Sequence, residues 1–215
     1  MRKIVHFIAG KDFEDSSERT SPVYAPNTGE VQAEVSLANK ATLEYAIETA
    51  KAAQAEWAAT NPQRRARVMF KFKELVEANR DRLAALLSSE HGKVLVDAQG
   101  DIQRGLEVIE FACGIPHAQK GEYTEGAGPG IDVYSMRQAL GVVARITPFN
   151  FPAMIPMWMF GVAIACGNAF ILKPSERDPS VPVELAKLMI EAGLPAGVLN
   201  VVHGDKEAVD GILDH

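Results

Sequence analysis

The alternation of strand-like and helix-like segments over residues 141–215 constrains the fold more than any other feature of this chain. Short apolar runs are separated there by stretches in which apolar residues recur at helical spacing. The predicted strands are Gly141–Ile146, Ala169–Leu172 and Val198–Val202, and the predicted helices are Ala153–Cys166, Ser180–Ala192 and Lys206–Asp214. Because this alternation is typical of a parallel sheet covered by helices, we predict an α/β fold with a partial Rossmann-type parallel sheet and helices on both faces.

The first 120 residues follow a different pattern, which predicts an N-terminal region of β-hairpins and helices. Short apolar runs broken by glycine, proline and an Asn-Thr-Gly turn predict strands in hairpins before residue 40. Helical spacing then predicts three helices, over Thr42–Ala59, from Pro62 to about His91, and over about Val96–Cys113. Gly92 suits the C-cap of the second helix. The third helix is expected to bury Ile102, Leu106, Ile109 and Phe111.

Residues 121–141 predict two strands around a glycine-rich tip. The tip sequence, GAGPG, is a near match to the glycine-rich loops that bind dinucleotides. It lacks the third glycine at the required spacing, and no helix follows it, so we interpret it as the tip of a hairpin.

The segment Phe149–Leu172 carries no charged residue, so a membrane span is one alternative for it. Prolines, glycines and asparagines divide the segment, and Arg145 and Lys173 are the only basic residues that flank it closely. We therefore expect a buried helix followed by a buried strand, and no membrane association.

Composition excludes several other classes of protein. A net charge of -6 and a pI near 5.4 give no general attraction to nucleic acid or to anionic membranes. The two cysteines, Cys113 and Cys166, are too few for a disulfide framework or a zinc site, and the histidines show no metal-ligand spacing. We therefore expect no metal and a reducing, cytoplasmic setting. The N-terminal apolar run is too short for the core of a signal peptide.

Polar residues follow three of the predicted strands, where an open parallel sheet binds its ligands. These positions are Thr147–Asn150, Lys173–Arg177 and His203–Asp205. Lys173 and Glu176 could both reach the hydroxyls of a nucleotide ribose, and the alternative is an exposed ion pair within the loop. Asn150 stands between two phenylalanines, where an unpaired amide in an apolar setting would cost about 1–3 kcal/mol, so we expect it to have a partner.

Several strings of the sequence together resemble a known family. GVVARITPFNFP, MWMFGVAIACGNAFILKPSERDPS and AGLPAGVLNVVHGD are similar to the aldehyde dehydrogenase superfamily, and within it most of all to the coenzyme A-acylating methylmalonate-semialdehyde dehydrogenases. FIAGKDFE, YAPNTGEV, EHGK and RGLEVIEFACG extend the resemblance nearly from end to end. The pair PFNFP and KPSER is its most specific part.

The resemblance implies a role for seven residues. Asn150 would donate its side-chain N–H to the oxygen of the substrate thiohemiacetal and thioester, as part of an oxyanion hole. Lys173 and Glu176 would bind the adenosine ribose of NAD. Arg104 would hold the carboxylate of the substrate, whereas without the resemblance it would be a surface arginine paired with Asp101 or Glu107. The remaining residues, placed along the path of the cofactor, are Thr147, Phe149 and Arg177.

The resemblance also implies a domain organisation. Residues 1–120 would form the N-terminal part of the NAD-binding domain, 121–140 the hairpin of an oligomerisation domain, and 141–215 the first part of the Rossmann-like sheet. The family's catalytic cysteine, general base and pyrophosphate-binding turn lie beyond the position of His215. We therefore expect the catalytic domain to be missing from these residues and these residues alone to be inactive.

The activity implied for the whole enzyme is NAD-dependent oxidation of methylmalonate or malonate semialdehyde to an acyl-CoA, through a cysteine thioester and with coenzyme A as co-substrate. The resemblance also implies a place in valine catabolism and a homo-oligomer, either a dimer or a tetramer. One alternative is a hydrolytic aldehyde dehydrogenase that releases a free acid. The other, for these residues alone, is a non-catalytic nucleotide-binding or assembly module.

Overall fold

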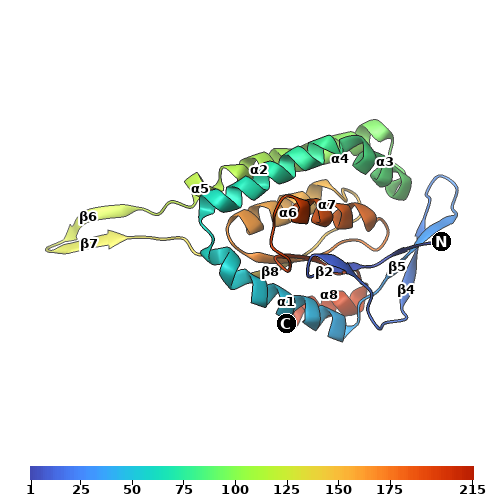
Figure 1. Cartoon of the computed structure of the whole chain (residues 1–215), viewed down its shortest axis with the longest axis horizontal. Coiled ribbons are helices and arrows are strands. Elements are labelled where there is room, and N and C mark those ends of the chain that lie inside the picture. The colour runs from blue at the N-terminus through green and yellow to red at the C-terminus, as the bar shows by residue number, and fades with distance from the viewer.

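A five-stranded sheet in the order β3-β2-β10-β9-β8 lies at the centre of the computed structural model, which describes residues 1–215 (Figure 1). Three strands, β8 (Val142–Ile146), β9 (Ala169–Lys173) and β10 (Leu199–Val201), are parallel, as the alternating pattern predicts. The N-terminal hairpin adds β2 (His6–Ile8), which pairs antiparallel with β10, and β3 (Lys11–Phe13), which pairs antiparallel with β2 at the edge of the sheet. The predicted α/β fold is confirmed, and the complete sheet is mixed.

Helices cover both faces of this sheet (Figure 1). Helices α6 (Met154–Ala165) and α7 (Ser180–Glu191) pack on one face, and α1 (Lys40–Ala59) and α8 (Lys206–Leu213) on the other. A further layer of helices covers α6 and α7 from outside. Because α6 lies between the sheet and this outer layer, it needs no polar face, which explains the uncharged segment. No helix is both long and apolar enough to span a membrane.

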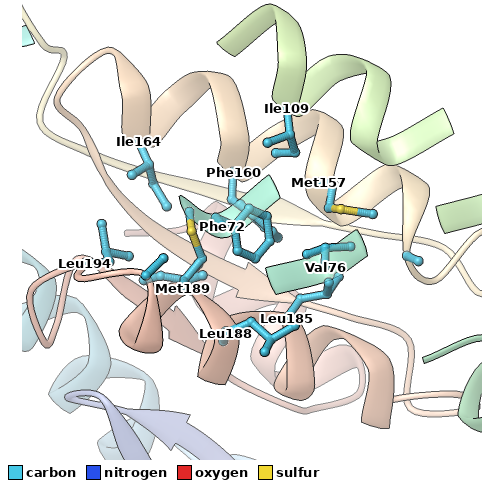
Figure 2. Packing of buried hydrophobic residues seen from close by; sticks show 14 of the residues in the cluster. Phe72, Val76, Ile109, Met157, Phe160, Ile164, Leu185, Leu188, Met189 and Leu194 are labelled. Carbon is cyan, nitrogen blue, oxygen red and sulfur yellow. The ribbon is translucent and has the colours of Figure 1, made fainter. Parts of the chain in front are cut away.

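The main hydrophobic core extends from one face of the sheet through α6 and α7 to the outer helices (Figure 2). At its centre Phe160 makes edge-on contacts with Phe72 and Phe170, at centroid distances of 5.8 and 6.5 Å. Helices α4 and α6 approach closely at Gly105, where a Cβ atom would lie 2.2 Å from Cε of Met157. A larger residue there would have to displace the flexible end of the Met157 side chain, and its Cβ atom would lie 3.3 Å from Cα of Met154.

The outer layer consists of α2 (Pro62–Ala78), α3 (Arg80–His91) and α4 (Leu95–Cys113), with the short helix α5 (Ile115–Ala118) after them. The prediction of one helix from Pro62 to His91 is wrong, because it breaks at Asn79. The Asn79 amide donates to the carbonyl of Leu75 at 2.8 Å, and asparagine competes with the helix for backbone partners in this way. Gly92 has the left-handed conformation expected of a C-cap, with φ of 84°.

The expected burial of Phe111 on α4 is also wrong, because 61% of this residue is exposed. Ile102, Leu106 and Ile109 do face the core. Phe111 follows Ile109 by two residues, which is about 200° around a helix with 3.6 residues per turn, and so it points away from the buried side.

Two smaller sheets complete the fold. Strands β1 (Arg2–Ile4), β5 (Val31–Ser36) and β4 (Thr20–Tyr24) form a three-stranded sheet near the N-terminus. Strands β6 (Tyr123–Gly128) and β7 (Ile131–Tyr134) form the predicted hairpin, which extends away from all other elements (Figure 1). Gly130 takes a positive φ angle in the turn between the strands, and Gly126 takes one at the register shift within β6.

Candidate functional site

The carboxyl ends of β8 and β9 lie side by side and bring two of the predicted loops together. Ile146 is in register with Lys173, and the backbone N–H of Thr147 donates to the carbonyl of Lys173 at 3.0 Å. The loops that begin with Thr147 and Pro174 therefore share one edge of the sheet, as the positions of these residues after parallel strands predict.

Lys173 and Glu176 form an ion pair at this edge, with 3.0 Å between Nζ and Oε2. The lysine side chain is only 6% exposed, whereas the glutamate side chain is 37% exposed, so the pair is not a fully solvated loop pair. Partial burial acts to raise the pKa of the Glu176 carboxyl, but a backbone hydrogen bond and the bond from Lys173 outweigh it and lower the pKa. The site thus presents an accessible, ionised carboxylate beside a buried ammonium.

The hydroxyl of Thr147 lies in the same region without a partner. Thr147 is 3% exposed, and its Oγ1 makes no hydrogen bond within the chain. A buried hydroxyl is normally bonded, so an unpaired one beside Lys173 is consistent with a ligand or water that completes it.

Phe149 and Arg177 form an exposed stacked pair next to this site. The guanidinium carbon of Arg177 lies 5.0 Å from the centroid of the Phe149 ring, within the range of a cation–π contact. Both residues and Glu176 line a cavity of about 550 Å³, together with Tyr24 and Asp178. Three of the five predicted cofactor residues, Phe149, Glu176 and Arg177, therefore border a single hollow in the surface, whereas Thr147 and Lys173 do not line it.

Asn150 is exposed, and its side chain makes no hydrogen bond within the chain. Its backbone carbonyl, in contrast, accepts from Nζ of Lys93 at 3.0 Å. The expected packing of the amide between Phe149 and Phe151 is not observed, because Phe149 lies against Arg177 and Phe151 lies under Lys93. The amide does not need a partner from the chain, since it is not in an apolar setting.

Arg104 is exposed on α4 and makes no ion pair, so pairing with Asp101 or Glu107 is excluded. Its backbone carbonyl accepts from the indole N–H of Trp158 on α6 at 3.1 Å. The guanidinium is therefore a free cation, and the backbone of Arg104 lies against α6, the helix that follows Asn150.

The third predicted loop, His203–Asp205, does not contribute its polar side chains to this site. The imidazole of His203 is fully buried and contacts the carbonyl of Val5 at 3.1 Å, while its backbone N–H donates to His6. Burial lowers the pKa of His203 to about 3, so this ring is neutral. Asp205 caps α8 instead, accepting from the N–H of Glu207 at 3.2 Å.

Neither cysteine has the environment of a nucleophile. Burial raises the pKa of both thiols, Cys113 and Cys166, which keeps them protonated at neutral pH. No group of histidine, cysteine, aspartate and glutamate side chains is arranged to hold a metal ion.

A cluster of mostly buried titratable groups beneath the Asn150 loop has no counterpart in the residue-level predictions. Its members are Glu90, Lys93, Asp101 and Asp178. Burial, and secondly the charge of Glu90, raise the pKa of Asp178 to about 8. Sequence position gave little sign of this cluster, because its members come from three separate segments. The nearest signal is a charged residue at a helical position that otherwise faces the core, as at Asp101 between Ala98 and Ile102.

Comparison with known proteins identifies relatives along the whole chain. A model of the aldehyde dehydrogenase family matches residues 13–215. A solved structure from Sinorhizobium meliloti 1021, described as a candidate methylmalonate-semialdehyde dehydrogenase complexed with NAD, is 67% identical with a TM-score of 0.99, over 100% of this chain and 44% of its own. The malonate-semialdehyde dehydrogenase of Pseudomonas aeruginosa is 54% identical over 99% of this chain and 43% of that protein. The acylating, mitochondrial methylmalonate-semialdehyde dehydrogenase of Arabidopsis thaliana is 50% identical over 99% of this chain and 35% of that protein. This chain thus spans less than half the length of each.

Proposed function

Because the chain belongs to the aldehyde dehydrogenase family, we propose that it forms the NAD-binding part of a semialdehyde dehydrogenase. The observation that carries the proposal is the Lys173–Glu176 pair at the end of β9, beside the unpartnered hydroxyl of Thr147. A carboxylate that accepts from vicinal hydroxyls, next to a buried ammonium that donates, fits the adenosine ribose of NAD. The NAD complex of the similar Sinorhizobium meliloti protein supports this choice of cofactor.

Three neighbouring residues extend the proposed cofactor surface. We assign Thr147, Phe149 and Arg177 to the path of the cofactor, because the first has a free buried hydroxyl and the other two border the cavity that Glu176 also lines. When bound, NAD supplies the acceptor for the hydride that leaves the aldehyde carbon. The residues of this chain bind and orient it. A 2′-phosphate would meet the Glu176 carboxylate, so we expect NAD to be preferred over NADP.

In the proposed mechanism Asn150 donates a hydrogen bond to the reacting oxygen. Its amide is exposed and has no partner within the chain, so both N–H donors are available to a ligand. A fixed donor aimed at an oxygen that gains negative charge stabilises the transition state, and one such donor is typically worth about 10²–10³ in rate.

The proposed substrate is malonate or methylmalonate semialdehyde, and coenzyme A is the proposed acyl acceptor. Arg104 supports a carboxylated substrate because its guanidinium is exposed and unpaired, on a residue whose backbone contacts α6. The names of the two relatives that are 54% and 50% identical support the semialdehydes, and the word acylating in the second supports coenzyme A. Products formed with and without coenzyme A would separate this reaction from hydrolysis: an acyl-CoA supports it, and a free acid supports the hydrolytic alternative.

The remaining parts of the proposal are a homo-oligomer, a cytoplasmic location and, if methylmalonate semialdehyde is the substrate, a place in valine catabolism. The protruding hairpin of β6 and β7 supports an oligomer, since it exposes apolar residues on every side of the strands. The bacterial relatives, at 67% and 54% identity, support the cytoplasm over an organelle.

Glu176→Gln tests the cofactor assignment in an enzyme of the relatives' full length that carries this chain. We expect the Kd for NAD to rise roughly tenfold or more and the preference over NADP to narrow, because a hydrogen bond to a charged group is worth about 1.5–3 kcal/mol. Glu74→Gln is the matched control, since Glu74 also pairs with a lysine three residues away, but on the exposed face of α2. Equal binding of NAD and NADP by the unmodified enzyme would contradict the assignment.

A further inference from the structure

A buried ion pair lies directly beneath the loop that carries Asn150. Lys93 follows α3 and Asp101 belongs to α4, and their Nζ and Oδ2 atoms are 2.9 Å apart. The lysine side chain is 11% exposed and the aspartate side chain is fully buried. A pair this deeply buried is held in place by its further hydrogen bonds.

Each member of the pair has a second bond, and the two bonds go to opposite ends of one turn. Lys93 Nζ donates to the carbonyl of Asn150 at 3.0 Å. Asp101 Oδ1 accepts from the backbone N–H of Met154 at 2.7 Å. The ion pair thus holds residues 150–154 at both ends, and the Lys93 ammonium also lies 4.6 Å from the centroid of the Phe151 ring between them.

The other backbone hydrogen bonds of this turn are long: the carbonyls of Phe151 and Ala153 accept from the N–H groups of Ile155 and Met157, each at 3.2 Å. Met154 is the first residue of α6, and the N-cap residue Ala153 has no side chain that could accept from the helix. Asp101 therefore caps α6 from another helix, a place where a carboxylate also meets the favourable end of the helix dipole. The side chain of Asn150 makes no hydrogen bond, so the chain controls the amide only through the position of the backbone that carries it.

We propose that Lys93 and Asp101 are positioning residues, which fix the Asn150 turn so that its amide points toward the reacting oxygen. This inference rests on the proposed role of Asn150 as an oxyanion donor. Lys93 sets the position of the Asn150 carbonyl, and Asp101 fixes the start of α6. Neither residue touches the substrate. The pair acts through Asn150, and the cofactor residues at the end of β9 do not depend on it.

A double-mutant cycle in an enzyme of the relatives' full length that carries this chain tests the proposal. Asn150→Ala is expected to lower kcat by roughly 10²–10³-fold. Lys93→Met is expected to lower kcat at least about tenfold while leaving the Kd for NAD unchanged. If Lys93 acts through Asn150, the double variant is no slower than Asn150→Ala alone. Lys187→Met is the matched control, because Lys187 forms surface ion pairs with Asp12 and Glu184.

The outcomes separate the two proposals. If Asn150→Ala has normal kcat, the proposed function of Asn150 fails. If Asn150→Ala is slow but Lys93→Met is normal, or if the two losses multiply in the double variant, the positioning role fails and the pair is merely structural.

Hydrogen exchange on the 215-residue chain gives a readout that does not need activity. In Asp101→Asn the Met154 amide and its neighbours in the turn are expected to exchange faster, while the amides of β9 and β10 keep their protection. Uniform loss of protection across the chain would show a general folding defect and overturn the local role. Lys93→Met is also expected to lower the protection of the turn. Lys93→Arg, which keeps the charge, is expected to retain much of that protection.

Discussion

Arg104 is the residue whose proposed role separates a carboxylated semialdehyde from a plain aldehyde as substrate. Its guanidinium is exposed and unpaired, so it can make two charge-assisted hydrogen bonds to a carboxylate without breaking any bond of its own. Arg104→Leu in the full-length enzyme should raise KM for malonate semialdehyde at least about tenfold, since such a bond is worth ~1.5–3 kcal/mol. Propanal, which lacks the carboxylate, should react as before. Equal losses with both substrates would point to a folding role.

Contacts between individual residues were predictable where they depend only on the residues' place at the end of a strand. Lys173 is the last residue of β9, and Glu176 follows it by three positions. Their proximity could therefore be predicted from the order of the residues alone. The bonds from Lys93 to Asn150 and from Asp101 to Met154 join residues 57 and 53 positions apart. Nothing local in the sequence specifies such contacts, since they depend on how α4 packs against α6.

Among the elements, the β6–β7 hairpin is the one whose surface no other part of this chain covers. Tyr123, Ile131, Val133 and Tyr134 are each more than half exposed, and no other element packs on them (Figure 1). Since exposed apolar strands favour association, we expect the 215-residue chain to form dimers or larger species as its concentration rises. The double variant Ile131→Lys/Val133→Lys should lower the mass measured by light scattering.

Phe70→Lys is the matched control for the hairpin variant, because Phe70 is an exposed apolar residue on α2, remote from the hairpin. Association that persists in the hairpin variant, or that disappears equally in the control, would assign the contact to another surface. The exposed edge of β8 would then be the next surface to test, since β8 is the last strand of the five-stranded sheet.

The type and order of elements were largely predictable, because period-2 and period-3.6 patterns are local properties of the sequence. The errors have local and non-local causes. Asn79 breaks a helix through a single side-chain bond that the apolar spacing does not register. The antiparallel pairing of β2 with β10 joins segments about 190 residues apart, so the mixed character of the sheet required the folded structure.

At the scale of the whole molecule, buried titratable groups should give the chain a stability maximum near neutral pH. The histidines His6, His91 and His203 all have lowered pKa values, mainly because burial disfavours the charged ring. Each binds a proton less readily when folded, so together they destabilise the chain as pH falls below about 6.5, the usual pKa of the unfolded ring. Above that pH they contribute no further change.

Asp178 acts in the opposite direction and over a different range. Its pKa is raised to about 8, by burial and then by Glu90, and its Oδ1 has no partner. The folded chain therefore keeps a proton that the unfolded chain loses near pH 4, so stability falls as pH rises from about 4 to about 8 and then levels off. Below about pH 6.5 the histidines oppose this trend. Between about pH 6.5 and 8 the change in unfolding free energy should therefore come from Asp178 alone.

Asp178→Asn tests this assignment, because the amide keeps the size of the side chain but cannot ionise. In urea unfolding from pH 6.5 to 8, the unmodified chain should lose up to about 1.4 kcal/mol of unfolding free energy per pH unit, and the variant should show a nearly flat profile. Asp132→Asn, at an exposed carboxylate with a lowered pKa on the hairpin, should leave the decline unchanged. A decline of equal slope in Asp178→Asn would assign the pH dependence to another group and contradict the raised pKa of Asp178.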